Sequence, residues 1–159
     1  MRSTPYATGD SQARGHYLAS VSALPSIHDI YGEYELVDTE DRYRLLIDLG
    51  RRLEPMPDAL KTDATKVRGC AASVWVYPTV SQGRLHFLAD SNAAITKGIV
   101  ALILSAVQDR PASEVARIDI GEALAPFELR KHLSANRTQG VPNMIALVRQ
   151  TAERYASAA

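Results

Sequence analysis

The chain has 159 residues, of which 46% are hydrophobic and 23% are charged, and these proportions and this length suit one globular domain. Its 18 basic and 18 acidic residues give a formal net charge of zero, which argues against a nucleic-acid-binding protein, because such proteins usually carry a basic excess. Cys70 is the single cysteine, so an intrachain disulfide and an all-cysteine zinc or iron–sulfur site built from this chain are excluded. A chain that needs no disulfide is expected in the reducing cytoplasm.

The two halves of the chain differ in charge. Residues 29–64 hold ten acids and five bases, whereas residues 65–159 hold seven acids and eleven bases. The cysteine therefore lies in the basic half. The asymmetry is interpreted as two solvated faces of mixed charge.

The N-terminal stretch, residues 1–27, is predicted to be a flexible extension, because it lacks apolar periodicity and ends in the sequence Leu24-Pro25-Ser26. It has no continuous apolar run of the kind that a secretory signal contains. Farther along, the longest apolar run covers residues 99–107, well short of the roughly 18 to 20 residues that a membrane span needs. That run predicts a buried helix, and no membrane partner is expected.

Helices are predicted at the start of the domain. The first covers residues 27–36, and a second begins at an N-cap formed by Asp38 or Thr39 and is loosened or ended by Gly50. The pattern of apolar residues then changes from a helical to a strand period. Residues 66–69 are β-compatible, and residues 73–77 form a strand that Pro78 ends. After a turn at residues 81–83, residues 84–88 form the second strand of a hairpin.

The last third is predicted to be helical again. Asn92 caps a helix that runs to about Gln108, Pro111 starts a short one, and residues 127–133 form another. Pro142 suits the first turn of a final helix, whose apolar stripe contains Met144, Leu147, Val148, Thr151 and Tyr155. Helices before and after a small antiparallel sheet predict an α+β fold, with that sheet packed against the helices. Neither βαβ alternation nor a glycine-rich phosphate loop is present.

Cys70 is the one obvious nucleophile in the sequence. Gly69 beside it permits an unusual backbone conformation and leaves room for a second reactant. Arg68 and Lys66 are cations close in sequence, which predicts a lowered pKa for the thiol and a larger fraction of reactive thiolate. The alternative is that Cys70 is a small buried side chain with a structural role.

Histidine supplies weaker signals. His86 lies in the predicted second strand and His132 near a helix end, and a Cys–His dyad between Cys70 and either of them is a hypothesis that sequence spacing does not test. No HExxH motif and no cluster of acidic residues is present, so no metal site is predicted.

Three segments together resemble the SufE-like sulfur-acceptor family. VRGCAASVWV (67–76) resembles its cysteine-loop signature, DSNAAITKG (90–98) the segment after its hairpin, and HLSANRTQG (132–140) its C-terminal signature. Residues 43–53, which close in Leu-Gly-Arg-Arg-Leu, are similar to the family's first long helix. The resemblance covers residues 28–155 in the family's order and departs from it at Ala71, where relatives often carry glutamine. It implies a SufE/IscU-like α+β domain over residues 28–159.

The resemblance also implies a function. SufE-like proteins accept sulfane sulfur from a SufS-type cysteine desulfurase, stimulate that enzyme, hold the sulfur as a persulfide on their own cysteine and pass it to a SufBCD-type iron–sulfur scaffold. Cys70 matches the acceptor, and Arg137 matches the arginine of the C-terminal signature, so Arg68, Gly69 and Arg137 are expected to contact the partner. The chain is then a carrier without a cofactor, since the pyridoxal phosphate belongs to the desulfurase. A homodimer is left open.

Other functions fit the same residues. One is a CsdE-like carrier that serves another sulfur-transfer pathway. A second is a cysteine hydrolase or transferase, which requires a positioned histidine and an oxyanion pocket. A third is a non-catalytic adaptor in which Cys70 is structural. The lack of a second, resolving cysteine suits a carrier, because such a cysteine would release the sulfur by forming a disulfide.

Overall fold

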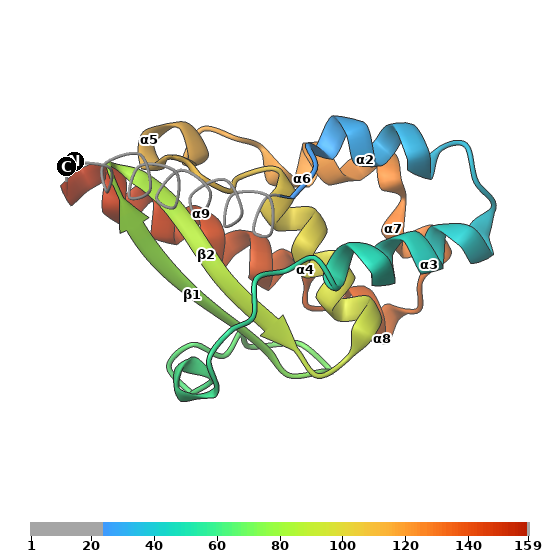
Figure 1. Cartoon of the computed structure of the whole chain (residues 1–159), viewed down its shortest axis with the longest axis horizontal. Helices are drawn as coiled ribbons and strands as arrows, with labels where there is room; N and C mark the ends of the chain where they lie inside the picture. Colours follow the sequence, from blue (N-terminus) through green and yellow to red (C-terminus); the bar gives the residue numbers. More distant parts are fainter. Residues whose placement is uncertain (1–23, 159) are drawn as a thin grey trace, which may run out of the picture.

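The computed structural model describes residues 24–158. Helices flank a small antiparallel sheet (Figure 1), so the predicted α+β class is confirmed. The elements in chain order are α2 (Ile27–Tyr34), α3 (Thr39–Gly50), η1 (Asp58–Leu60), β1 (Val74–Ser81), β2 (Arg84–Ser91), α4 (Ala94–Ser105), β3 (Arg110–Pro111), α5 (Ala112–Val115), α6 (Ile120–Leu124), η2 (Ala125–Phe127), α7 (Leu129–His132), α8 (Ala135–Thr138) and α9 (Val141–Ala158).

The hairpin of β1 and β2 dominates the sheet. Its register pairs Val74 with Ser91 at one end and Ser81 with Arg84 at the other. Between the strands, Gln82 and Gly83 both have positive φ values, 53° and 75°, which is the conformation of a two-residue type I′ turn. The predicted turn is confirmed. β3 adds two residues to the free edge of β2, giving the order β1-β2-β3, and the sequence showed no signal for it.

The prediction that Pro78 ends the first strand is wrong, because β1 continues through it to Ser81. Pro78 pairs with Phe87, whose backbone N–H and C=O bond instead to the side-chain amide of Gln108, at 2.8 and 2.9 Å. Phe87 therefore does not need a hydrogen bond from the backbone N–H that Pro78 lacks. Because β1 is also an edge strand, the proline leaves the ladder intact.

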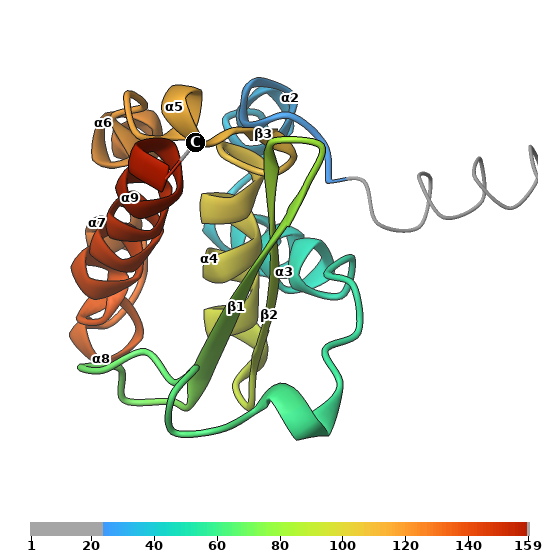
Figure 2. The same ribbon diagram turned by 90° about the vertical axis from the view of Figure 1, so that its left-hand side faces the viewer.

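Helix α4 forms the centre of the core. Nine of its twelve residues are buried, which is why its sequence is apolar all round. Figure 2 shows α4 behind the hairpin, with α9 on one side and α3 on the other. Gly50 ends α3, as predicted, and lies directly against Gly98 of α4: a Cβ at Gly50 would be 2.7 Å from the Gly98 nitrogen.

Local signals for helix starts were confirmed in part. Asp38 caps α3 by accepting a 3.0 Å hydrogen bond from the Asp41 N–H. Asn92 does not cap α4, since its side-chain oxygen accepts from the Ser73 N–H and Ala93 takes the cap position. The helix predicted over residues 127–133 is split, because Glu128 adopts a left-handed conformation between η2 and α7.

The predicted flexible extension over residues 1–27 lies outside the described residues up to residue 23, and it stays a prediction. Of its last part, Leu24 and Ile27 pack against the core, and Ile27 begins α2. Within residues 24–158, no helix is long and apolar enough to cross a membrane.

Candidate functional site

Cys70 lies on a loop whose two ends are tied to the hairpin. On the N-terminal side, the Val67 N–H donates to the Val74 carbonyl at 2.8 Å, and Lys66 forms a single antiparallel bridge with Trp75. On the other side, the Ser73 carbonyl accepts from the Ser91 hydroxyl at 2.7 Å. The β-compatible stretch predicted at residues 66–69 is therefore one bridge, and the loop of residues 68–72 projects from a fixed base.

The same loop rests on the beginning of α9. The Asn143 side-chain amide donates to the Arg68 carbonyl at 2.8 Å. Gly69 has a φ of 81°, and a side chain there would collide with Asn143. Gly140, which precedes α9 and is buried, lies so close to Cys70 that a Cβ at Gly140 would overlap the Cys70 sulfur. Glycine at both positions thus brings the thiol against the helix start.

The surroundings of the thiol correct the prediction of a lowered pKa. Cys70 is a free cysteine of intermediate exposure, and burial raises the pKa of its thiol. Neither Arg68 nor Lys66 lowers that pKa, although both are close in sequence. In this conformation burial therefore disfavours the thiolate, which is the form that reacts with electrophiles and oxidants.

The other predicted site residues lie around the loop. Arg68 is exposed, and its backbone rather than its side chain makes the contact with α9. Arg137 is exposed on α8, three residues before Gly140, and donates to the Tyr43 hydroxyl of α3 at 3.3 Å. The segment that carries Arg137 is thus joined to the thiol through Gly140, while the arginine side chain itself is held by α3.

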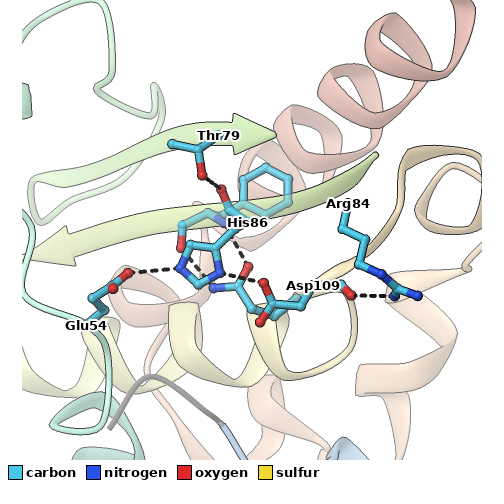
Figure 3. Close-up of polar contacts among 7 residues, drawn as sticks. Glu54, Thr79, Arg84, His86 and Asp109 are labelled. Carbon is cyan, nitrogen blue, oxygen red and sulfur yellow. Dashed lines mark hydrogen bonds and ion pairs between the residues drawn. The ribbon is translucent and has the colours of Figure 1, made fainter. Parts of the chain in front are cut away.

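Neither proposed Cys–His dyad is formed in the part of the chain that the structure describes. His86 lies between two carboxylates, with Nε2 2.9 Å from Glu54 and Nδ1 2.7 Å from Asp109 (Figure 3). Burial acts to lower the pKa of His86, but the hydrogen bonds to Glu54 and Asp109 act to raise it, and the net direction is upward. His132 accepts a hydrogen bond from Arg42 at 3.1 Å instead.

Sequence reasoning gave no role to Gly140 or Asn143. The only local signal was that Gly140 closes the C-terminal signature, and the contact of Asn143 with Arg68 joins residues 75 positions apart. Among residues 24–158, no three His, Cys, Asp or Glu side chains gather in a way that could hold a metal ion. The site so described consists of one sheltered thiol, two glycines and exposed arginines.

Comparison with known proteins identifies the family. The model of the SufE family, described as an Fe-S metabolism associated domain, matches residues 28–152. The chain belongs to the SufE family. A SufE-like protein of Rhizobium meliloti is 35% identical over 135 residues, covering 82% of this chain and 96% of the relative. The sulfur acceptor protein CsdE of Escherichia coli is 36% identical over 134 residues, covering 82% of this chain and 88% of CsdE.

The fold also matches a solved structure. The solution structure of a hypothetical protein from Thermus thermophilus superposes with a TM-score of 0.68, covering 85% of this chain and 98% of that one. The two sequences are 14% identical, so this match supports the fold alone. The resemblance to the SufE family seen in three sequence segments is confirmed by the family match, and the segment with Cys70 lies inside the matched residues.

Proposed function

We propose that this SufE-family protein is a sulfur acceptor and carrier that takes persulfide sulfur from a cysteine desulfurase onto Cys70. One observation carries the proposal: the single cysteine of the chain lies on a surface loop that is fixed at both ends and backed by Gly140. The similarity to CsdE, a sulfur acceptor protein, supports the same role. The chain is then an activator and substrate of the desulfurase rather than an enzyme in its own right.

The transfer is a thiol exchange. The Cys70 thiolate attacks the outer sulfur of the desulfurase's cysteine persulfide, the new S–S bond forms on Cys70, and the desulfurase thiolate leaves. The Cys70 proton must be lost first, and burial opposes that loss. A partner that draws the loop outward would remove the burial and so restore the thiolate. Such a partner must bind the outward conformation better than the inward one.

The exposed groups beside the loop are proposed to contact the partner. Arg137 offers a planar, permanently charged fork of donors and is already oriented by Tyr43. Arg68 adds a second exposed cation on the loop itself. Gly69, with its positive φ, supplies a joint at which the loop direction changes without steric conflict.

The remaining parts of the proposal are those that the resemblance to the SufE family implies. The partner is a SufS-type desulfurase with its own pyridoxal phosphate, so this chain needs no cofactor. The persulfide is delivered to a SufBCD-type scaffold for iron–sulfur cluster assembly. A carrier suits this step because no second cysteine of the chain competes for the sulfur. The reducing cytoplasm, where free thiols persist, is the proposed site of action. The CsdE-like alternative is a carrier for another sulfur-transfer pathway, with a different desulfurase partner and a different final recipient.

The test is the stimulation of a purified SufS-type desulfurase by wild type and by Cys70→Ser. Serine is nearly isosteric, so unchanged thermal unfolding is expected to show that the fold survives. We expect the variant to lose stimulation completely. Full stimulation by Cys70→Ser would rule out the carrier role. A hydrolase role predicts instead that wild type cleaves small thioesters without desulfurase, for which neither His86 nor His132 is in place.

A further inference from the structure

A groove runs along α9 on the side that faces α6 and α7. It encloses about 820 Å³. One wall is α9, with Val141, Ile145 and Arg149, and the opposite wall includes Leu124 and Leu129. Figure 2 shows α6, α7 and α8 beside α9, away from the hairpin. The groove is thus a surface feature of the helical side of the molecule, with an apolar floor.

Helix α9 carries two stripes of side chains, and only one of them enters the core. The first stripe, with Met144, Val148 and Ala152, is buried in the core. The second stripe has Val141, Ile145 and Arg149 at every fourth residue and continues to Glu153, and these side chains line the groove. This second stripe is about 18 Å long, from the helical rise of about 1.5 Å per residue. An α-helix of about three turns would match that length.

The charges at the groove are not balanced within the described chain. Lys131 pairs with Glu128 at 3.3 Å. Arg130 and Arg149 line the groove without forming an ion pair or hydrogen bond within residues 24–158, and Glu153 lies at the end farthest along α9. An occupant that complements this groove has an apolar face and acidic residues opposite the two arginines.

The groove begins beside the residue that packs on the thiol. Gly140 packs on Cys70, and the next residue, Val141, lines the groove. A protein that brings its own cysteine to Cys70 therefore lies at the mouth of the groove. Because the groove is formed by helices and not by the loop of residues 68–72, contacts made there would persist while that loop moves.

We propose that this groove docks an amphipathic, acid-bearing helix of the cysteine desulfurase. The proposal rests on the proposed function. A long apolar channel beside one helix suits a docked helix better than it suits a compact ligand. The desulfurase is the chosen occupant because, under the proposed function, it brings its own cysteine persulfide to Cys70, beside the residue that precedes the groove.

The first test measures binding of the SufS-type desulfurase from the same organism to the full-length protein by calorimetry. Arg130→Glu combined with Arg149→Glu is expected to weaken binding at least about ten-fold, since charge reversal in a complementary site is repulsive. Ala146→Trp, which fills the groove from an exposed position of α9, should weaken it similarly. The matched control is Arg117→Glu, an exposed arginine outside the groove.

The second test places a photo-crosslinking amino acid at Ala146, with one at exposed Ser113 as control. The expected product at Ala146 is a crosslink to an acid-rich helix of the desulfurase. Affinity of the double variant equal to that of Arg117→Glu, or crosslinks only to a sulfur-receiving protein or to a second copy of the chain, would overturn the proposal. In those cases wild-type Cys70 still takes up sulfur, whereas failure of that uptake would overturn the proposed function instead.

Discussion

Glycine brings two segments into close contact at two places in this molecule, and the two contacts differ in what they meet. A Cβ at Gly98 would lie 2.6 Å from the carbonyl carbon of Leu46, which is backbone of a neighbouring helix. A Cβ at Gly140 would instead meet Cys70 on its loop. The first contact joins α3 to α4 within the core, and the second joins α9 to the loop of residues 68–72. Close packing therefore fixes the core in one place and shelters a reactive group in the other.

The largest effect on stability is expected at the core contact. Gly98→Ala would force α3 away from α4, and overpacking of this kind costs about 1–3 kcal/mol of unfolding free energy. Gly32→Ala is the control, because nothing lies within 4 Å of a Cβ there and a helical alanine is favoured by about 0.5–1 kcal/mol. Chemical denaturation measures both. Equal stability of Gly98→Ala and wild type would show that the α3–α4 contact yields without strain.

A smaller loss of stability, but a change in reactivity, is expected at the loop contact. Gly140→Ala should cost about 1 kcal/mol, because the loop can shift where a helix cannot. The shift exposes the thiol, so alkylation of Cys70 by iodoacetamide should become several-fold faster than in wild type. Wild type itself should react more slowly than a model peptide thiol, since burial raises the pKa of Cys70.

Gly121→Ala serves as the control for that measurement, because a Cβ there meets only an Asp119 oxygen at an ordinary 3.6 Å.

Amide exchange of the loop should also increase when the desulfurase binds. If wild type is alkylated as fast as the peptide thiol and loop exchange is unchanged in the complex, the thiol is permanently exposed and the sheltering role of Gly140 is wrong.

Replacing Arg137 tests partner binding without disturbing either of the two glycine contacts. Arg137→Ala removes an exposed side chain whose hydrogen bond to Tyr43 is long, so unfolding free energy should change by less than about 1 kcal/mol. Alkylation of Cys70 should stay as in wild type, while stimulation of the desulfurase falls. Arg117→Ala controls for the loss of one exposed arginine. Wild-type binding and stimulation by Arg137→Ala would show that the arginine of the signature has no role with the partner.

The smallest effect is expected at His86, which lies on β2 between Glu54 and Asp109. Its pKa is raised above the ordinary 6.5, so its pairs with Glu54 and Asp109 stabilise the fold below about pH 6.5 and lose that contribution as the pH rises through the raised value. The stability difference between wild type and His86→Gln should therefore shrink from about pH 6 to pH 8. The rate of Cys70 alkylation should be the same in both proteins. A slower rate in His86→Gln would indicate that His86 activates Cys70, as the Cys–His dyad hypothesis requires.

Several predictions that rested on a local signal succeeded, although the Asn92 cap did not. The Asp38 cap and the turn at Gln82 and Gly83 depend on residues within a few positions of each other. Prediction also failed at Pro78, where the strand continues because Gln108 satisfies the backbone of Phe87 from across the fold. The final helix was also predicted, and three residues of its expected apolar stripe, Met144, Val148 and Thr151, are buried in α9.

At the site, the sequence pointed to the thiol but not to its environment. Cys70 and Arg137 emerged from motifs, whereas Gly140 and Asn143 acquire their roles only by contact with a loop about 70 residues away. The expected effect of Arg68 on the thiol failed for the same reason: closeness in sequence did not set the pKa, and burial against α9 did. Long-range packing of this kind leaves no trace in a local pattern.

The most direct test of the carrier role is to incubate the protein with a SufS-type desulfurase and cysteine, block free thiols, and map the added mass on peptides of the chain. We expect one additional sulfur atom on the peptide that contains Cys70, released by a reductant and absent from Cys70→Ser. An unmodified Cys70 after turnover of the desulfurase, with the enzyme bound to this protein, would contradict it.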